Sequence, residues 1–140
     1  MERTNAIKKR LSKNDTGETG GHQAGMLIPK NSEILSFFPD LNNTEKNPRV
    51  LLNFKDNFEK RWSFSFIYYN NKFFGGTRNE YRLTGMTKFF RANKLSEGDE
   101  VILERNINGF YNVRFQKLND LNLVSDNKLI LNNKWVSIKI

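Results

Sequence analysis

The chain has 140 residues, the size of one domain, and carries 23 Lys and Arg against 15 Asp and Glu, a net charge of +8. Such a basic chain attracts polyanions such as nucleic acid or an anionic membrane. It contains no cysteine and a single histidine, His22, which excludes disulfides, thiolate zinc sites, cysteine nucleophiles and two-histidine mechanisms. No apolar run is long enough for a membrane span, and the lack of cysteine agrees with a reducing cytoplasm.

The first 25 residues differ in character from the rest. Ile7 and Leu11 are spaced for a short helix. Residues 12–25 contain four glycines and no large apolar side chain, which predicts an exposed loop or arm. A flexible terminus without a function is the alternative.

The body of the chain begins with a short strand at residues 26–29. Asn31 or Ser32 can cap a helix that continues through Phe38 and ends at Pro39. A polar loop follows this helix.

The clearest alternation lies in residues 62–68, where large aromatic side chains take turns with serines. A strand is predicted there, preceded by another over residues 50–54. Asn70 and Asn71 indicate a hairpin turn into a further extended stretch, residues 72–74.

A second helix is expected after Gly85, because Met86, Phe89 and Phe90 fall on one helical face. Alternating apolar residues predict further strands at 101–104, 111–115, 129–131 and 136–140. Seven or eight short strands with short connections predict a mainly β, antiparallel sandwich or barrel with two short helices.

Residues 77–82 are the first candidate for function. Arg78, Asn79, Glu80 and Arg82 supply the side chains that read guanine, adenine and cytosine in a major groove. In an extended segment Arg78, Glu80 and Arg82 project on one side, about 7 Å apart. An ordinary strand with surface ion pairs is the alternative.

Residues 13–23 are the second candidate. They combine a cation, acids, amides, hydroxyls and His22 on a glycine-rich backbone that can approach a phosphate or a base edge closely. A polar loop without a function is again the alternative. A lone histidine lacks the partners of a catalytic triad, so a hydrogen-bonding role for His22 is favoured.

Nuclease chemistry has weaker support. Asp40 and Asp126 lie in short stretches that match fragments of a metal-dependent nuclease signature, but matches this short arise by chance. No phosphate-binding loop is present. A small Mg²⁺-dependent nuclease and an RNA or protein interaction module stay as alternatives, and no cofactor or metal is expected.

Two motifs resemble known families. Residues 83–101, LTGMTKFFRANKLSEGDEV, resemble the plant B-three DNA-binding domain. Residues 16–25, TGETGGHQAG, followed by IPK at residues 28–30, are similar to the N-terminal effector-DNA-binding domain of EcoRII-type restriction endonucleases. Together the motifs bracket residues 12–105.

The resemblance implies a seven-stranded open pseudobarrel with two short α-helices, in one domain of residues 1–140. Residues 1–25 would hold the N-terminal segment and the N-arm, residues 13–23. Residues 26–140 would form the barrel that carries the C-arm, residues 76–82. The two arms would grip the major groove of double-stranded DNA like a wrench, and a nuclease domain would be supplied by the same or another chain.

The predicted base-reading residues are Asn14, Asp15, Thr16, Glu18, His22, Gln23, Arg78, Asn79, Glu80 and Arg82. The predicted contacts to the DNA backbone are Lys9, Arg10, Lys13, Arg49, Lys72 and Tyr81. We expect this chain to be a sequence-specific DNA-binding module without enzymatic activity of its own. We also expect it to be cytoplasmic and monomeric as an isolated domain.

Overall fold

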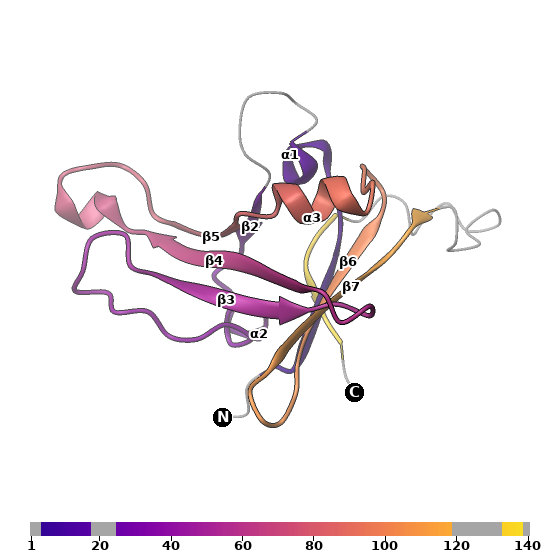
Figure 1. The fold of residues 1–140 in the computed structure, drawn as a ribbon. Helices are drawn as coiled ribbons and strands as arrows, with labels where there is room; N and C mark the ends of the chain where they lie inside the picture. Colours follow the sequence, from indigo (N-terminus) through magenta and orange to yellow (C-terminus); the bar gives the residue numbers. More distant parts are fainter. Residues whose placement is uncertain (1–3, 18–24, 119–132, 139–140) are drawn as a thin grey trace.

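A computed structural model describes residues 4–17, 25–118 and 133–138 (Figure 1). Its strands are β1 (Ala6–Arg10), β2 (Gly25–Ile28), β3 (Arg49–Lys55), β4 (Arg61–Tyr69), β5 (Glu80–Thr84), β6 (Glu100–Arg105), β7 (Tyr111–Gln116) and β8 (Val136–Ser137). Its helices are α1 (Lys13–Thr16), α2 (Ser32–Leu35), α3 (Thr87–Ala92) and the 3-10 helix η1 (Asn71–Phe74).

The eight described strands form one curled sheet in the order β2-β5-β4-β3-β7-β6-β1-β8. All neighbours pair antiparallel except β3 and β7, which run parallel over two residue pairs. Figure 1 shows β3 and β4 crossing β6, β7 and β1 steeply, so the sheet curls into an open half-barrel. This confirms the predicted mainly antiparallel pseudobarrel. Its eight described strands are one more than the seven that the resemblance implies, and α1 is a third α-helix besides the two expected.

The two sheet edges approach each other. The indole Nε1 of Trp135, next to β8, donates a hydrogen bond to the backbone oxygen of Leu27 in β2 at 2.9 Å. Thr4, ahead of β1, donates from Oγ1 to the backbone oxygen of Glu33 in α2 at 2.6 Å. Hydrogen bonds from side chains therefore link the two edges of the sheet, where the described strands β2 and β8 do not pair with each other.

The alternation in β4 places its aromatic side chains as predicted. Phe64 and Phe66 are buried in the core, whereas Ser63 lies on the exposed outer face. Phe66 stacks on Phe38 with ring centroids 4.4 Å apart. Burial of large aromatic surface is the main favourable term in such a core.

Both predicted helices are present. The side chain of Asn31 caps α2 by accepting a hydrogen bond from the backbone N–H of Ile34 at 3.0 Å. The helix ends earlier than predicted, and Phe38 lies in the turn that follows it. In α3 the buried side chains are Phe89 and Phe90, which confirms the predicted apolar face.

The structure corrects three expectations. Residues 6–10 form a strand rather than a helix, because β1 pairs with β6 on one side and β8 on the other. Residues 13–16, predicted as part of a loop, form α1. Residues 72–74 belong to η1 instead of an extended stretch. Gly75 ends this 3-10 helix with a left-handed φ of 90°. The strand expected at 129–131 lies outside the described residues, and β8 covers part of the strand expected at 136–140.

Candidate nucleic-acid interface

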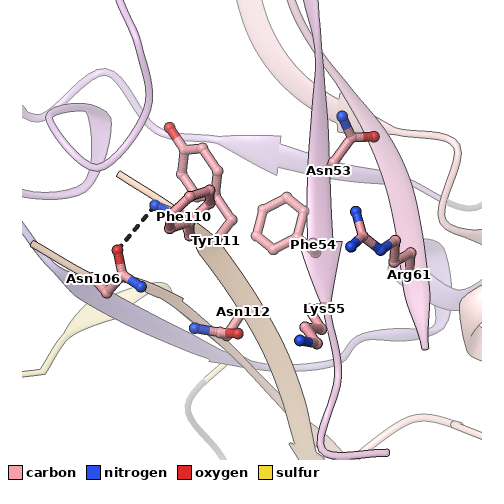
Figure 2. Close-up of a pocket in the computed structure, with 8 residues that line it drawn as sticks. All are labelled: Asn53, Phe54, Lys55, Arg61, Asn106, Phe110, Tyr111 and Asn112. Atoms are coloured by element: carbon pink, nitrogen blue, oxygen red, sulfur yellow. Dashed lines mark hydrogen bonds between the residues drawn. The ribbon is translucent and has the colours of Figure 1, made fainter. Parts of the chain in front are cut away.

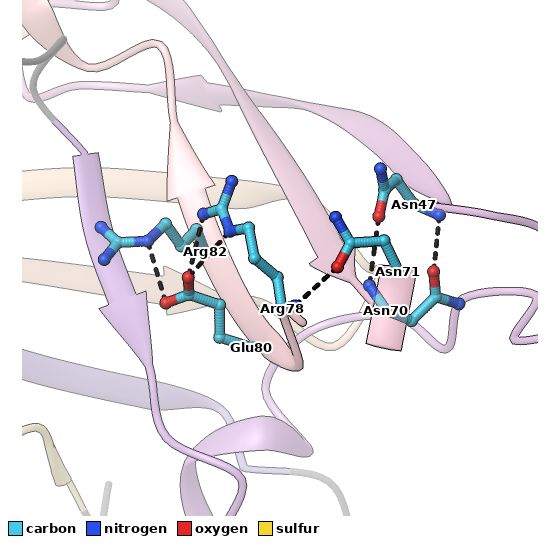
Figure 3. A network of polar contacts seen from close by, with 6 residues as sticks. All are labelled: Asn47, Asn70, Asn71, Arg78, Glu80 and Arg82. Carbon is cyan, nitrogen blue, oxygen red and sulfur yellow. Dashed lines mark hydrogen bonds and ion pairs between the residues drawn. The ribbon is translucent and has the colours of Figure 1, made fainter. Parts of the chain in front are cut away.

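The C-arm follows η1 and is anchored at its base by Asn70. The Asn70 side chain is 1% exposed and bridges to the loop before β3 (Figure 3). Its Oδ1 accepts from the backbone N–H of Asn47 at 2.7 Å, and its Nδ2 donates to the backbone oxygen of Glu45 at 2.8 Å. The Asn47 side chain returns a bond by accepting from the Asn70 N–H at 3.1 Å. The arm therefore rises from a rigid base.

A second asparagine closes the turn on itself. The Oδ1 of Asn71 accepts from the backbone N–H of Arg78 at 2.6 Å, and its backbone oxygen accepts from Gly76 at 2.7 Å. A Cβ at Gly76 would lie 2.8 Å from the Asn71 side chain, so this close approach requires glycine. The bonds fix the point from which the Arg78 side chain leaves the arm.

Three of the four predicted readers in the C-arm lie together, with Glu80 between Arg78 and Arg82 (Figure 3). Glu80 Oε1 accepts from Arg78 Nη2 at 2.9 Å and Nε at 3.1 Å. Its Oε2 accepts from Arg82 Nε at 3.2 Å. The sequence prediction that these side chains share one side of an extended segment is confirmed.

The arginines shift the ionisation of the carboxylate between them. Partial burial opposes the charged form of Glu80, but the hydrogen bond from Arg78 and the charges of Arg82 and Arg78 outweigh it. The pKa of Glu80 is therefore lowered below its ordinary value, and the group stays an ionised acceptor. Its side chain remains 28% exposed, so solvent and a ligand can reach it.

Aromatic residues contact the side chains of the C-arm. The guanidinium carbon of Arg78 lies 3.7 Å from the ring centroid of Tyr69, a cation–π contact. Tyr68 donates its hydroxyl to Asn79 Oδ1 at 2.6 Å and stacks on Tyr81 at 4.2 Å. Asn79 keeps its amide donors for other partners, whereas Tyr81 is half-buried among aromatic rings. Burial, followed by Tyr68 and Asp40, raises the pKa of Tyr81.

The described part of the N-arm is built around a buried carboxylate. Asp15 is 5% exposed, accepts from the backbone N–H of Ser12 at 2.9 Å and pairs with Lys9. Ser12 Oγ accepts from the Asp15 N–H in return, a capping box that starts α1. Gly17 ends the helix with a left-handed φ of 81°.

The remaining predicted residues differ in their surroundings. Lys13 and Asn14 are exposed on α1, and Thr16 is half-buried there. Arg10 is buried and donates from Nη1 to the backbone oxygen of Gly98 at 2.8 Å. Lys72 is exposed in η1, and Arg49 is exposed in β3, opposite Ile67, which in turn lies opposite Arg82. Glu18, His22 and Gln23 lie outside the described residues.

Tyr69 and the Asn47–Asn70 bridge were missed by the sequence reasoning. Tyr69 stands one position beyond the aromatic alternation of β4, on the opposite face, where it meets Arg78. The adjacent pair Asn70 and Asn71 was interpreted as a hairpin turn, although asparagines also hold turns through side-chain bonds. Asn47 has a φ of 52°, a conformation that asparagine tolerates well.

The acidic residues do not gather as a metal site in the described part of the chain. Within residues 4–17, 25–118 and 133–138, no three Asp, Glu or His side chains form a group that could hold a metal ion. Asp40 is exposed in the loop after α2, and Asp126 lies outside the described residues. None of the helices in these ranges has the length and apolar character that a membrane crossing requires.

The curled open sheet has the fold of the B-three-type pseudobarrel. The solved Arabidopsis FUS3-DNA complex has this fold, with a TM-score of 0.60 and 20% identity over 79% of this chain and 94% of that chain. The Arabidopsis thaliana transcription factor LEC2-DNA complex gives 0.59 and 18% identity over 81% and 96%. At these identities the likeness shows the fold alone.

The chain belongs to the family of the restriction endonuclease EcoRII N-terminal domain, whose sequence pattern matches residues 2–116. The type II restriction enzyme EcoRII of Escherichia coli is 47% identical over 83 residues, which cover 54% of this chain and 19% of the enzyme. This chain therefore spans about a fifth of that relative's length. The resemblance identified from residues 16–30 and 83–101 is confirmed.

Proposed function

We propose that this chain binds double-stranded DNA sequence-specifically, as the target or effector recognition module of a restriction endonuclease. The observation that carries the proposal is the row of Arg78, Glu80 and Arg82 on the outer face of the C-arm. One carboxylate holds two guanidinium groups at fixed positions beside each other. This arrangement presents donors for guanine and an acceptor for the cytosine amine from one rigid strand.

The fixed positions of the two arginines favour recognition of bases over non-specific electrostatic attraction to DNA. Arg82 bonds to Glu80 through Nε, which leaves both terminal nitrogens to donate to the two acceptors of guanine. Arg78 is held from below by Tyr69 and from the side by Glu80. Arginines ordered before binding lose less side-chain entropy when they meet a base.

In the N-arm we propose a division between residues that shape the arm and residues that touch DNA. Lys13 and Asn14 are exposed on α1 and could meet a groove, whereas the half-buried Thr16 donates its hydroxyl to the backbone oxygen of Lys13 and would have to exchange that partner. Asp15 is engaged by Lys9 and Ser12, so any base contact would require it to exchange these partners. The proposed base contacts of Glu18, His22 and Gln23 rest on their residue types in a glycine-rich arm.

Backbone contacts would position the arms without reading sequence. Lys72 and Arg49 flank the C-arm and are exposed, which suits them to phosphates. Lys9 and Arg10 are already paired within the fold, with Asp15 and Gly98, and would contribute charge at longer range. Tyr81 would meet the sugar-phosphate backbone through the exposed part of its ring.

The comparisons support the same partner. Both plant structures of this fold are complexes with DNA, and the bacterial relative is a restriction enzyme. We propose that a nuclease domain, in the same or another chain, cuts the DNA that this module recognises. The proposed location is the cytoplasm, where restriction enzymes meet incoming DNA, and the isolated module is proposed to be a monomer.

Selection from a library of random duplexes tests the proposal. Repeated binding should enrich one short sequence, and the enriched duplex should be retarded intact in a gel. A plasmid carrying that sequence, incubated with the chain and Mg²⁺, should also remain uncut. Binding without enrichment would contradict sequence-specific recognition, and cleavage would favour the Mg²⁺-dependent nuclease instead.

A further inference from the structure

A second basic surface lies outside both arms, where β4 and α3 begin. It is a hollow of about 460 Å³, here called the basic hollow. Its lining residues are Lys60, Arg61, Trp62, Ser63, Gly85, Lys88 and Ala92. Three of them are cations and none is acidic, so the hollow is suited to an anion.

The cations of the basic hollow differ from the arginines of the C-arm in their partners. The side chains of Arg61 and Lys88 form no hydrogen bond or ion pair with any residue in the described ranges. Lys60 places its ammonium 4.5 Å from the centroid of the Trp62 ring. Lys60 also interacts electrostatically with Asp56, so the two cations without a partner in the described ranges are Arg61 and Lys88. Unpaired surface cations beside a depression mark a place where an external anion can supply the missing partner.

Apart from Trp62 and the three cations, the lining residues of the hollow are small: Ser63, Gly85 and Ala92. Gly85 has a left-handed φ of 80°, and a Cβ added there would find only the backbone oxygen of Ser63, 3.7 Å away. The indole of Trp62 is committed to the fold, because its Nε1 donates to Asp56 and its ring packs edge-on against Phe89. Lys60 lies over the Trp62 ring, so a base could stack on that face only by displacing the ammonium, and phosphate is the better match.

The basic hollow shares its face of the sheet with the C-arm. Arg61 and Ser63 alternate along β4 with the same period as Ile67 and Tyr69, so all four point away from the face of Phe64 and Phe66, although Ile67 is covered by its neighbours there. Ile67 stands opposite Arg82. Ile67 lies six positions after Arg61, a distance of about 20 Å at the rise of a strand, or about six base-pair steps of duplex DNA.

Arg61 also borders a neighbouring hollow of about 500 Å³ between β3 and β7 (Figure 2). Its other lining residues are Asn53, Phe54, Lys55, Asn106, Phe110, Tyr111 and Asn112. In this neighbour the ammonium of Lys55 already faces Glu59 at 3.6 Å, and the walls are amides and aromatic rings. The concentration of unpaired charge therefore favours the basic hollow as the anion site.

We propose that the basic hollow binds backbone phosphates of duplex DNA beyond the bases read by the C-arm. Lys60, Arg61 and Lys88 would replace counterions at these phosphates and add affinity without adding sequence preference. This inference rests on the proposed DNA-binding function, which it extends from the recognised bases to the flanking duplex. The consequence is a footprint longer than the recognised sequence.

The test compares the double variant Arg61→Ala/Lys88→Ala with the natural chain on two duplexes. One duplex contains only the selected sequence, and the other extends it by about 12 base pairs on each side, twice the estimated reach. Each lost phosphate contact corresponds to about eightfold in affinity at 0.1 M salt, so the double variant should bind the long duplex up to about 60-fold more weakly. On the short duplex its affinity should be nearly unchanged.

Two further readouts make the result specific. The log–log salt slope on the long duplex should become shallower by about 1.8, and the loss should be equal for selected and scrambled sequences. Arg114→Ala, which removes an exposed arginine from β7, is the matched control and should have a small effect. Lys88→Arg keeps the charge and should bind like the natural chain.

If the double variant loses the same affinity for the short and the long duplex, or if the salt slope is unchanged, the basic hollow does not bind flanking phosphates. DNA recognition by the C-arm would be unaffected by that result. Failure of the natural chain to bind any duplex would instead refute the proposed function itself. Thermal melting of each variant checks folding, and the exposed positions of Arg61 and Lys88 predict melting temperatures close to that of the natural chain.

Discussion

Replacing Glu80 by alanine distinguishes a carboxylate that reads a base from one that merely positions two arginines. Glu80 is the acidic member of the C-arm row and accepts bonds from Arg78 and Arg82. A carboxylate beside DNA repels phosphates, so the removal of a bystander should strengthen binding to every duplex. The removal of a group that accepts from a cytosine amine should weaken the selected complex and relax one position of the site.

The expected magnitudes separate these outcomes. Loss of a specific base contact costs about 1–3 kcal/mol, or about 5- to 150-fold in affinity for the selected duplex. Binding to a scrambled duplex should change little or improve. The exposed ion pairs that Glu80 forms are each worth about 0.2–1 kcal/mol to folding, so the free energy of unfolding should fall by less than about 2 kcal/mol.

Competition binding on selected and scrambled duplexes measures both quantities, and urea unfolding controls for stability. Glu80→Gln serves as the matched variant, since its amide oxygen can still accept from cytosine while the charge is lost. We expect it to retain more specificity than Glu80→Ala. If Glu80→Ala strengthens both complexes equally, the C-arm is a basic edge and the assignment of readers there is wrong.

Four other predictions concern the fold and the interface. Asn70→Ala should lower the free energy of unfolding by about 1–3 kcal/mol, because it strands buried partners such as the Asn47 N–H; an unchanged urea midpoint would contradict the anchoring role. Burial opposes ionisation of Asp99, but bonds from Lys117 and two backbone N–H groups lower its pKa. Its contribution to stability should therefore be present above about pH 4 and disappear as the pH falls through that lowered pKa, so the difference between the natural chain and Asp99→Asn in urea unfolding should vanish at low pH. Duplex RNA should bind only at the non-specific level, because its major groove is deep and narrow. The log–log salt slope of binding to duplex DNA should be near −5 if about six phosphates are contacted. Equal affinity for RNA and DNA, or a slope near zero, would refute a grip on the major groove.

The parts of the fold that were predictable are those in which local pattern and tertiary packing agree. The alternation of β4 gave the correct inward face, and the spacing of Phe89 and Phe90 gave the correct helix. The row of Arg78, Glu80 and Arg82 was predictable because the period of an extended chain alone places alternate side chains together.

Other parts depend on contacts that are distant in sequence. Residues 6–10 have no strong local preference, and β6 and β8, about 90 and 130 positions away, decide that they form a strand. The ion pair between Asp15 and Lys9 likewise depends on how α1 packs beside β1, which the local sequence does not show. The Ser12–Asp15 capping pattern was visible in the sequence and could have indicated a helix at the N-arm.

The short parallel contact between β3 and β7 has a mechanical consequence for the two arms. It joins the half of the sheet that contains β4 and β5 to the half that contains β6 and β1, through the pairs Phe54–Tyr111 and Lys55–Asn112. The C-arm stands wholly on the first half, whereas the N-arm leaves β1 on one half and returns through β2 on the other. We expect small rotations about this seam to change the distance between the two arms. A substitution at Tyr111, which lies in the seam, should therefore alter DNA binding although Tyr111 is not among the proposed DNA contacts.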